Sequence, residues 1–314
     1  MKRVLASICA AALALSLAAC SSTPSSSESS SAAEESSSAA STTEESSAAS
    51  DESTGASGSI TVVTREDGSG TRSAFIELTG VETDEGDMTI ATAQVANSTN
   101  NVMTSVQAEP SAIGYISMGS LNETVKGIAV DGVEPTTDNV KAGTYPISRP
   151  FNIVTNGDIS AQDELTQDFV NWVMSADGQA ICTEEGYIGD DAAEAYTSTQ
   201  PSGSLAVGGS SSVSPVMEKL IETYMADVNP NASIDLQTTD STNGVTGALD
   251  GTYQVGMASR AISDDEASQG AVSTQLAMDG IAVIVNTENA VSNISMDSLR
   301  GIYTGEVTDW ADVQ

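Results

Sequence analysis

One local pattern recurs three times in this chain: a short apolar run, a turn of small polar residues and then a segment with the composition of a helix. The three expected strands are Ser59–Val63, Ser204–Val207 and, in a looser third copy in which polar residues alternate with apolar ones, Ile234–Gln237. Strands that alternate with helices predict βαβ units and mostly parallel sheets. A further run, Ile281–Val285, is apolar throughout, as expected of a strand covered on both faces. The pattern therefore predicts an α/β fold for the chain beyond Gly58.

The first 58 residues have a different composition and divide into two parts. Residues 1–20 begin with Lys2 and Arg3, continue as an apolar run and end in small residues before Cys20. This is typical of a secretory signal peptide with the lipobox of a bacterial lipoprotein, in which Cys20 becomes the lipid-modified N-terminus. The alternative is an ordinary signal peptide with a chance cysteine. Residues 21–58 consist mainly of Ser, Ala, Thr and Glu, which predicts a disordered tether between membrane and folded domain.

The composition excludes most kinds of catalytic and nucleic-acid-binding site. The 314 residues include 44 acidic, 10 basic and no histidine residues, for a net charge of −34. A Ser-His-Asp triad, a Cys-His dyad and a His-ligated metal are therefore impossible, and the basic face of a nucleic-acid-binding protein is not expected. Cys9, Cys20 and Cys182 are too few and too scattered for a zinc cluster or a disulfide framework. We expect Cys182 to be a small buried apolar residue, and we expect no metal, cofactor or nucleic-acid partner.

The three turns together predict a binding site for an oxyanion. They span Arg65–Arg72, Gly208–Ser212 and Asp240–Gly244. The first backbone N–H groups of a helix are unpaired and its dipole favours negative charge, while glycine allows close approach and hydroxyls donate hydrogen bonds. A single such turn is commonly only a structural N-cap. Three turns, with the forked donor of Arg65 at one of them, indicate a tetrahedral oxyanion held by several helix ends.

At these turns the chain resembles the phosphate-binding proteins of the high-affinity phosphate ABC transporter, the PstS family. The resemblance covers nearly everything beyond Gly58 and is carried by Thr64–Arg72, Ala112–Ser117, Tyr145–Pro150, Gly209–Pro215, Gly256–Arg260, Asp279–Asn286 and Tyr303–Trp310. It implies a two-lobed periplasmic-binding-protein-like fold of the class II type, which closes on phosphate between its lobes. It also implies a monomeric, non-enzymatic solute-binding protein that is anchored at the outer face of the bacterial cytoplasmic membrane. Such a protein delivers inorganic phosphate to the permease subunits of an ABC transporter.

The resemblance also implies which residues contact phosphate. It assigns Arg65, Ser69, Gly70 and Thr71 to one lobe and Ser211, Ser212 and Ser241 to the other. Asp67 would hold Arg65 in place. Many family members have an aspartate where Arg260 stands, and that aspartate accepts the phosphate proton. Here Asp240 or Asp67 would accept the proton, or Arg260 would add a donor, so the choice between phosphate and another tetrahedral oxyanion stays open.

The order of the matching stretches departs from the family. There the stretch that resembles Gly209–Trp310 comes first, and the one that resembles Ile60–Tyr187 follows. The exchanged order predicts a circular permutation, with a shuffled gene as the alternative. The family's crossings between lobes then predict that residues 59–144 and 281–314 form lobe A and that residues 145–280 form lobe B. A phosphate-handling hydrolase and a surface phosphate sensor or adhesion module are the alternative functions.

Overall fold

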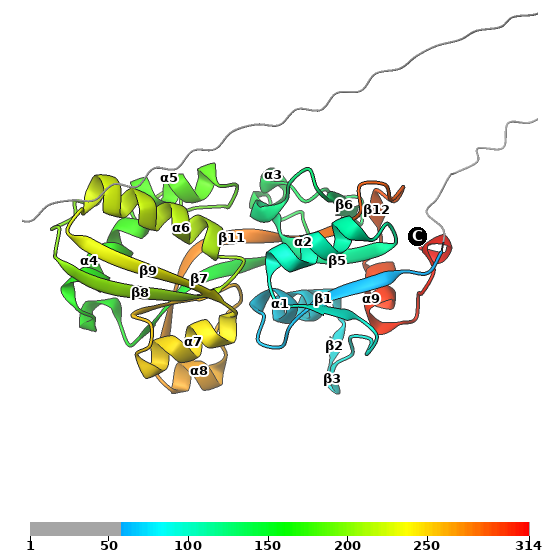
Figure 1. Ribbon diagram of the computed structural model, residues 1–314, viewed down its shortest axis with the longest axis horizontal. Helices are drawn as coiled ribbons and strands as arrows, with labels where there is room; N and C mark the ends of the chain where they lie inside the picture. Colours follow the sequence, from blue (N-terminus) through cyan, green and yellow to red (C-terminus); the bar gives the residue numbers. More distant parts are fainter. Residues whose placement is uncertain (1–57, 314) are drawn as a thin grey trace, which may run out of the picture. The chain divides into compact units, whose positions relative to one another are not determined.

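Residues 58–313, which this computed structural model describes, contain two large hydrophobic cores and a smaller buried cluster that includes Val154, Val245 and Ala271 (Figure 1). Core A contains buried side chains from two stretches of chain, Val62–Ile147 and Ile281–Trp310. Core B contains buried side chains from one stretch, Phe151–Ala277. The predicted signal peptide, lipobox and nearly all of the predicted tether lie outside the described residues.

Core A is built from two segments that lie far apart in the sequence. Its elements are β1 (Thr61–Arg65), α1 (Gly70–Thr79), β2 (Glu82–Thr83), β3 (Gly86–Asp87), β4 (Gln94–Ala96), α2 (Thr99–Ala108), β5 (Ala112–Ser117), β6 (Lys126–Val130), α3 (Thr137–Lys141), β12 (Asn293–Ile294) and α9 (Met296–Thr304), with 3₁₀ turns at Met118–Ser120 and Trp310–Asp312. The two ends of the described chain meet here, because Ile60 N donates to Thr308 O over 2.9 Å and Trp310 N donates to Gly58 O over 3.0 Å.

Core B is formed by the middle of the chain. Its elements are β7 (Ser148–Asn156), α4 (Glu164–Val173), α5 (Ala176–Glu184), β8 (Gly203–Ser210), α6 (Ser214–Thr223), β9 (Ala232–Thr239), α7 (Ser241–Asp250), β10 (Val255–Ala258) and α8 (Asp264–Ser268), with a 3₁₀ turn at Ile159–Ala161 and a π-helical turn at Tyr224–Val228. The last strand, β11 (Ala271–Val285), belongs to both cores.

The strands form one sheet in the order β4-β1-β5-β11-β7-β10-β8-β9, with β6 paired to β11 and β12 paired to β6. The pairs β1–β4, β1–β5, β8–β9, β8–β10 and β6–β12 are parallel, as predicted. The prediction of a mostly parallel arrangement is wrong in the middle of the sheet, where β11 is antiparallel to β5, β6 and β7, and β7 is antiparallel to β10. Ile281–Val285 is the end of a 15-residue strand that passes from core B into core A. Its direction is therefore set by that passage and not by a βαβ unit.

The three predicted strand-turn-helix units are present as β1–α1, β8–α6 and β9–α7. Ser69 and Asp240 are the N-caps of α1 and α7, since their side chains accept hydrogen bonds from Arg72 N and Asn243 N. Pro215 lies in the first turn of α6, where its missing N–H costs nothing. The turns are shorter than predicted, because β8 continues to Ser210 and α7 begins directly after Asp240.

Cys182, the cysteine within residues 58–313, is a small buried residue, as predicted. Cys182 is fully buried in core B, and burial raises the pKa of its thiol to about 12. It is therefore protonated and packed as a small apolar side chain.

Of the helices within residues 58–313, none is long and apolar enough to cross a membrane.

Candidate anion-binding site

The first of the three turns carries a buried row of donors at the start of α1. Arg65 ends β1, and Ser69, Gly70 and Thr71 lead into the helix. All four are buried, including the guanidinium-bearing side chain of Arg65, which is only 2% exposed. Gly68 makes the tight turn possible because its φ of +85° lies in the region that favours glycine.

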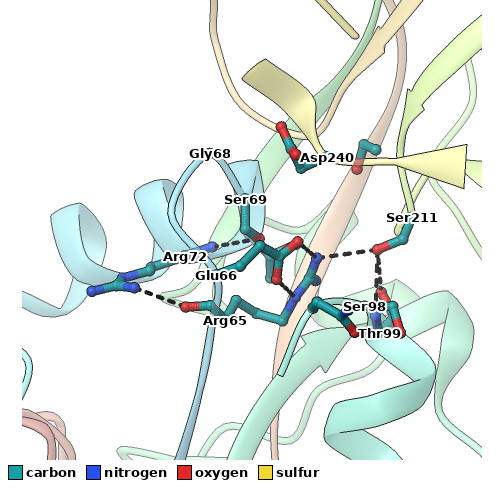
Figure 2. Close-up of polar contacts among 12 residues, drawn as sticks. Arg65, Glu66, Gly68, Ser69, Arg72, Ser98, Thr99, Ser211 and Asp240 are labelled. Atoms are coloured by element: carbon teal, nitrogen blue, oxygen red, sulfur yellow. Dashed lines mark hydrogen bonds and ion pairs between the residues drawn. The ribbon is translucent and has the colours of Figure 1, made fainter. Parts of the chain in front are cut away.

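Arg65 is held in a fixed orientation by its neighbours (Figure 2). Its Nε and Nη2 donate to Glu66 Oε2 and Oε1, each over 2.7 Å, which is the bidentate geometry of a strong ion pair. Nη2 also donates to Ser211 Oγ over 3.1 Å. The third nitrogen, Nη1, is buried and has no hydrogen-bond partner among the described residues. A buried cationic N–H without a partner is costly, so this atom marks the point where an anion would be most stabilised.

The second and third turns meet the first across the boundary between the two cores. Ser211 and Ser212 follow β8, and Thr71 Oγ1 lies 2.9 Å from Ser212 Oγ. Ser241, the first residue of α7, packs so closely on Gly70 that a Cβ at Gly70 would lie 2.3 Å from Ser241 Oγ. The structure therefore brings all seven predicted contact residues together, although they come from segments up to 176 positions apart.

A fourth helix end lies at the same place, and the sequence analysis did not include it. Thr99 is the first residue of α2, and its backbone N donates to Ser211 Oγ over 3.3 Å. Its hydroxyl lies 3.2 Å from Ser212 Oγ. The N-cap Ser98 was visible in the sequence, but only the three-residue strand β4 precedes it, so the apolar run that signalled the other turns was missing.

The predicted partner of Arg65 is wrong. Asp67 Oδ1 accepts a hydrogen bond from Arg72 Nη1 over 2.9 Å, and its side chain is 98% exposed. Glu66, one position earlier, points inward and forms the bidentate pair with Arg65. The turn directs these two neighbouring acidic side chains to opposite sides, which their order in the sequence does not reveal.

The other two residues considered for the phosphate proton also make their bonds elsewhere. Asp240 caps α7 by accepting from Asn243 N over 2.8 Å, and it lies beside Gly68. Arg260 is paired with Glu266, to which Nη1 and Nη2 donate over 2.8 and 2.7 Å. Within the described part of the chain, neither side chain is hydrogen-bonded to any of the seven contact residues.

A second buried arginine reaches this cluster, and the sequence analysis gave it no role. Arg149 Nη1 donates to Thr71 Oγ1 over 2.8 Å and to Ser259 O over 2.9 Å. Its Nη2 donates to Asp279 Oδ2 over 3.1 Å, and both side chains of this ion pair are buried. Burial raises the pKa of the Asp279 carboxyl to about 6, and the nearby positive charge of Arg149 opposes that increase. The available signal in the sequence was Asp279, a charged residue two positions before the apolar run Ile281–Val285.

The cluster as a whole is suited to bind an anion. It combines four helix N-termini, several hydroxyl groups and two arginines whose charges are compensated by Glu66 and Asp279. Such a set offers short hydrogen bonds in many directions without a large net charge, which suits a tetrahedral oxyanion. Between residues 58 and 313, no group of three or more acidic or cysteine side chains is arranged to hold a metal ion.

Comparison with known proteins places the chain in a family. A family model described as the PBP superfamily domain matches residues 32–177 and 194–314. The phosphate-binding protein PstS 2 of Streptococcus agalactiae is 46% identical over 266 residues, which cover 83% of this chain and 90% of that protein. This chain belongs to the PstS family. PstS 2 of Streptococcus pneumoniae is 42% identical over 264 residues, covering 82% of this chain and 89% of that protein.

A solved structure agrees with this family assignment. The crystal structure of a phosphate ABC transporter, phosphate-binding protein from Streptococcus pneumoniae matches the chain with a TM-score of 0.66 and 41% identity. The match covers 82% of this chain and all of that one. The predicted α/β fold of the periplasmic-binding-protein type is thereby confirmed. PstS of Bacillus subtilis, in contrast, is 35% identical over 141 residues, which cover 44% of each chain.

Proposed function

We propose that this protein is the solute-binding protein of a phosphate ABC transporter. It captures inorganic phosphate outside the cytoplasm and delivers it to the permease subunits. The observation that carries the proposal is the buried Nη1 of Arg65, which has no hydrogen-bond partner within residues 58–313 and belongs to a guanidinium that also contacts the Ser211 hydroxyl. Relatives and solved neighbours of the PstS family are named as phosphate-binding components of transporters and not as enzymes. The hydrolase and sensor alternatives have no comparable support.

Seven residues are proposed to contact the phosphate. They are Arg65, Ser69, Gly70 and Thr71 from the side of core A, and Ser211, Ser212 and Ser241 from the side of core B. Support comes from their burial and from the contacts that join the two sets, such as Arg65 to Ser211 and Thr71 to Ser212. An anion bound here would touch both halves at once and favour their closed arrangement.

The proton of hydrogen phosphate needs an acceptor, and the hydroxyl groups can supply it. Asp67, Asp240 and Arg260 are engaged elsewhere, whereas a serine or threonine hydroxyl both donates and accepts. We propose that the Thr99 hydroxyl accepts this proton, because Ser211 Oγ already accepts from Arg65 Nη2 and from Thr99 N. A neutral acceptor penalises a fully deprotonated oxyanion less than a carboxylate would, so this protein should discriminate against sulfate less strongly than a carboxylate-containing site.

Isothermal titration of the full chain tests the function directly. We expect one-to-one binding of phosphate, similar binding of arsenate, and weaker binding of sulfate and molybdate. Absence of phosphate binding would contradict the proposal. A chromogenic phosphate ester, incubated with and without divalent metal, tests the hydrolase alternative, and we expect no turnover in either case.

We also propose that the chain is circularly permuted relative to PstS proteins such as that of Bacillus subtilis, with lobe A formed by residues 59–144 and 281–314 and lobe B by residues 145–280. The Streptococcus PstS 2 proteins, which align with this chain over 90% and 89% of their length, would share its order. The membership of cores A and B supports this division except at its edge, where Tyr145 and Ile147 pack in core A. The two ends of the described chain pair with each other through a bridge between Ser59 and Asp309, as a permuted chain requires. An alignment to only 44% of Bacillus subtilis PstS is what two chains of different order would give.

Relinking the chain tests the permutation. A variant in which a short linker joins Gln314 to Gly58 and new ends open within residues 197–203 should fold and bind phosphate like the parent, since this connector is irregular and mostly exposed. Loss of folding in the relinked variant would contradict the proposed lobes.

The position at the membrane is proposed to depend on Cys20. Lipid on this cysteine would hold the protein at the outer face of the cytoplasmic membrane, and residues 21–58 would act as the tether. The support is the sequence alone, namely the basic start, the apolar run and the small residues before Cys20. We expect the anchored protein to act as a monomer.

A further inference from the structure

Arg149 and Asp279 lie at the passage between the two cores. They face each other directly in the register of β7 and β11, the two strands that run from one core toward the other (Figure 1). Their side chains form an ion pair of 3.1 Å and are 1% and 0% exposed. Asp279 also accepts a hydrogen bond from Ser117 Oγ over 3.0 Å. Each carboxylate oxygen of Asp279 therefore has a donor, Oδ1 from Ser117 and Oδ2 from Arg149.

The other end of Arg149 contacts both halves of the site. Nη1 donates to Thr71 Oγ1 at the start of α1 and to the carbonyl of Ser259 after β10. Ser259 in turn donates from its backbone N to Ser241 Oγ over 3.0 Å. One guanidinium thus links a proposed phosphate contact of core A to a proposed phosphate contact of core B.

This contact determines how the Thr71 hydroxyl can bind. A guanidinium only donates, so Thr71 Oγ1 must accept from Arg149 and direct its own proton elsewhere. The available acceptors are Ser212 Oγ, 2.9 Å away, and an anion bound among these side chains. Arg149 therefore makes Thr71 a donor toward the anion.

Stability alone gives little reason for this ion pair. Burying two charges costs solvation free energy, and well-packed apolar side chains commonly serve as well or better at such positions. Arg149 also has one unsatisfied nitrogen, because its Nε is buried without a partner among residues 58–313. A role in binding explains why the charge is kept here.

We propose that Arg149 is a positioning residue of the phosphate site, which fixes Thr71 as a donor and supplies positive charge, and that Asp279 is the counter-ion that limits this charge. The inference rests on the proposed function. It predicts that neutralising the two members of this ion pair changes phosphate affinity in opposite directions. Replacing Arg149 removes positive charge from the site, whereas replacing Asp279 removes the negative charge that offsets it.

Phosphate titration of Arg149→Met and Asp279→Asn in the full chain tests this. Arg149→Met should weaken phosphate binding at least about tenfold, whereas the nearly isosteric Asp279→Asn should strengthen it about threefold or more through the uncompensated charge. Arg300→Met, at an exposed position of α9, is the control for a lost positive charge and should bind like the parent.

A double-mutant cycle separates positioning from a merely structural role. If Arg149 acts through Thr71, then Thr71→Val combined with Arg149→Met should bind only slightly more weakly than Arg149→Met alone. Additive losses in the cycle, or weaker binding in Asp279→Asn, would overturn the inference. Should Arg149→Met fail to fold, unchanged or weaker binding by Asp279→Asn is sufficient to overturn it. A parent protein that binds no phosphate would instead refute the proposed function.

Discussion

Replacing Arg65 by methionine should nearly abolish phosphate binding, and the structure gives two contributions to the loss. The first is the charge-assisted hydrogen bond from the buried Nη1, whose removal costs about 1.5–3 kcal/mol. The second is the carboxylate of Glu66, which would remain close to the anion without its partner. Two unit charges about 6 Å apart repel by about 3 kcal/mol at an effective dielectric constant of about 20. The sum, about 5 kcal/mol, corresponds to a loss in affinity of more than about a thousandfold.

Isothermal titration of three variants separates these two contributions. Arg65→Met should show no measurable phosphate binding at concentrations that saturate the parent. Arg65→Met combined with Glu66→Gln removes the repulsion as well, so it should recover about 3 kcal/mol of the lost affinity. Arg300→Met should bind like the parent, since Arg300 is exposed on α9. Binding by Arg65→Met within a few-fold of the parent would refute the site, and a double variant no better than the single one would refute the repulsion.

Three further predictions concern the packing of the site, its buried carboxyl group and the anchor. Gly70→Ala should weaken phosphate binding by more than about 2 kcal/mol without unfolding the protein, because its Cβ would lie 2.3 Å from Ser241 Oγ; parent-like titration would contradict this. Asp279, which faces Arg149, Ser117 and the buried ring of Tyr187, has a pKa raised to about 6 in the folded protein and thus binds its proton more tightly there than in the unfolded chain. The free energy of unfolding of the parent relative to Asp279→Asn should therefore fall by roughly 2 kcal/mol as pH rises from about 4 to about 7. A difference that stays constant with pH in chemical denaturation would exclude this. Cys20→Ser should move the protein from the membrane fraction into the medium, and unchanged partition on fractionation would argue against the lipid anchor.

The local parts of the structure could be predicted from the sequence because their causes are local. An apolar run followed by Gly, Ser and Thr before a helix forms the same turn at β1–α1, β8–α6 and β9–α7. In each case the N-terminal residues of the helix have unpaired N–H groups that small polar side chains and ligands can satisfy. The candidate residues at these turns, from Arg65 to Ser241, therefore lie together in the structure as expected.

The features that the sequence did not reveal depend on direction and register between distant segments. Glu66 and Asp67 are chemically alike and adjacent, and only the geometry of the turn decides that Glu66 pairs with Arg65. The pair of Arg149 and Asp279 arises from the register of β7 against β11, which joins positions 130 residues apart. The antiparallel direction of β11 has the same origin, since that strand is shared between two cores.

A crystal structure of the protein grown with arsenate tests the central claim most directly, because arsenic can be located by its anomalous scattering and arsenate has the shape and charge of phosphate. The account predicts one strong anomalous peak per chain, within hydrogen-bonding distance of Arg65 Nη1 and flanked by the first residues of α1 and α7 and by Ser211. A peak at any other place on the molecule, or an occupied site that leaves Arg65 Nη1 without a partner, would contradict it.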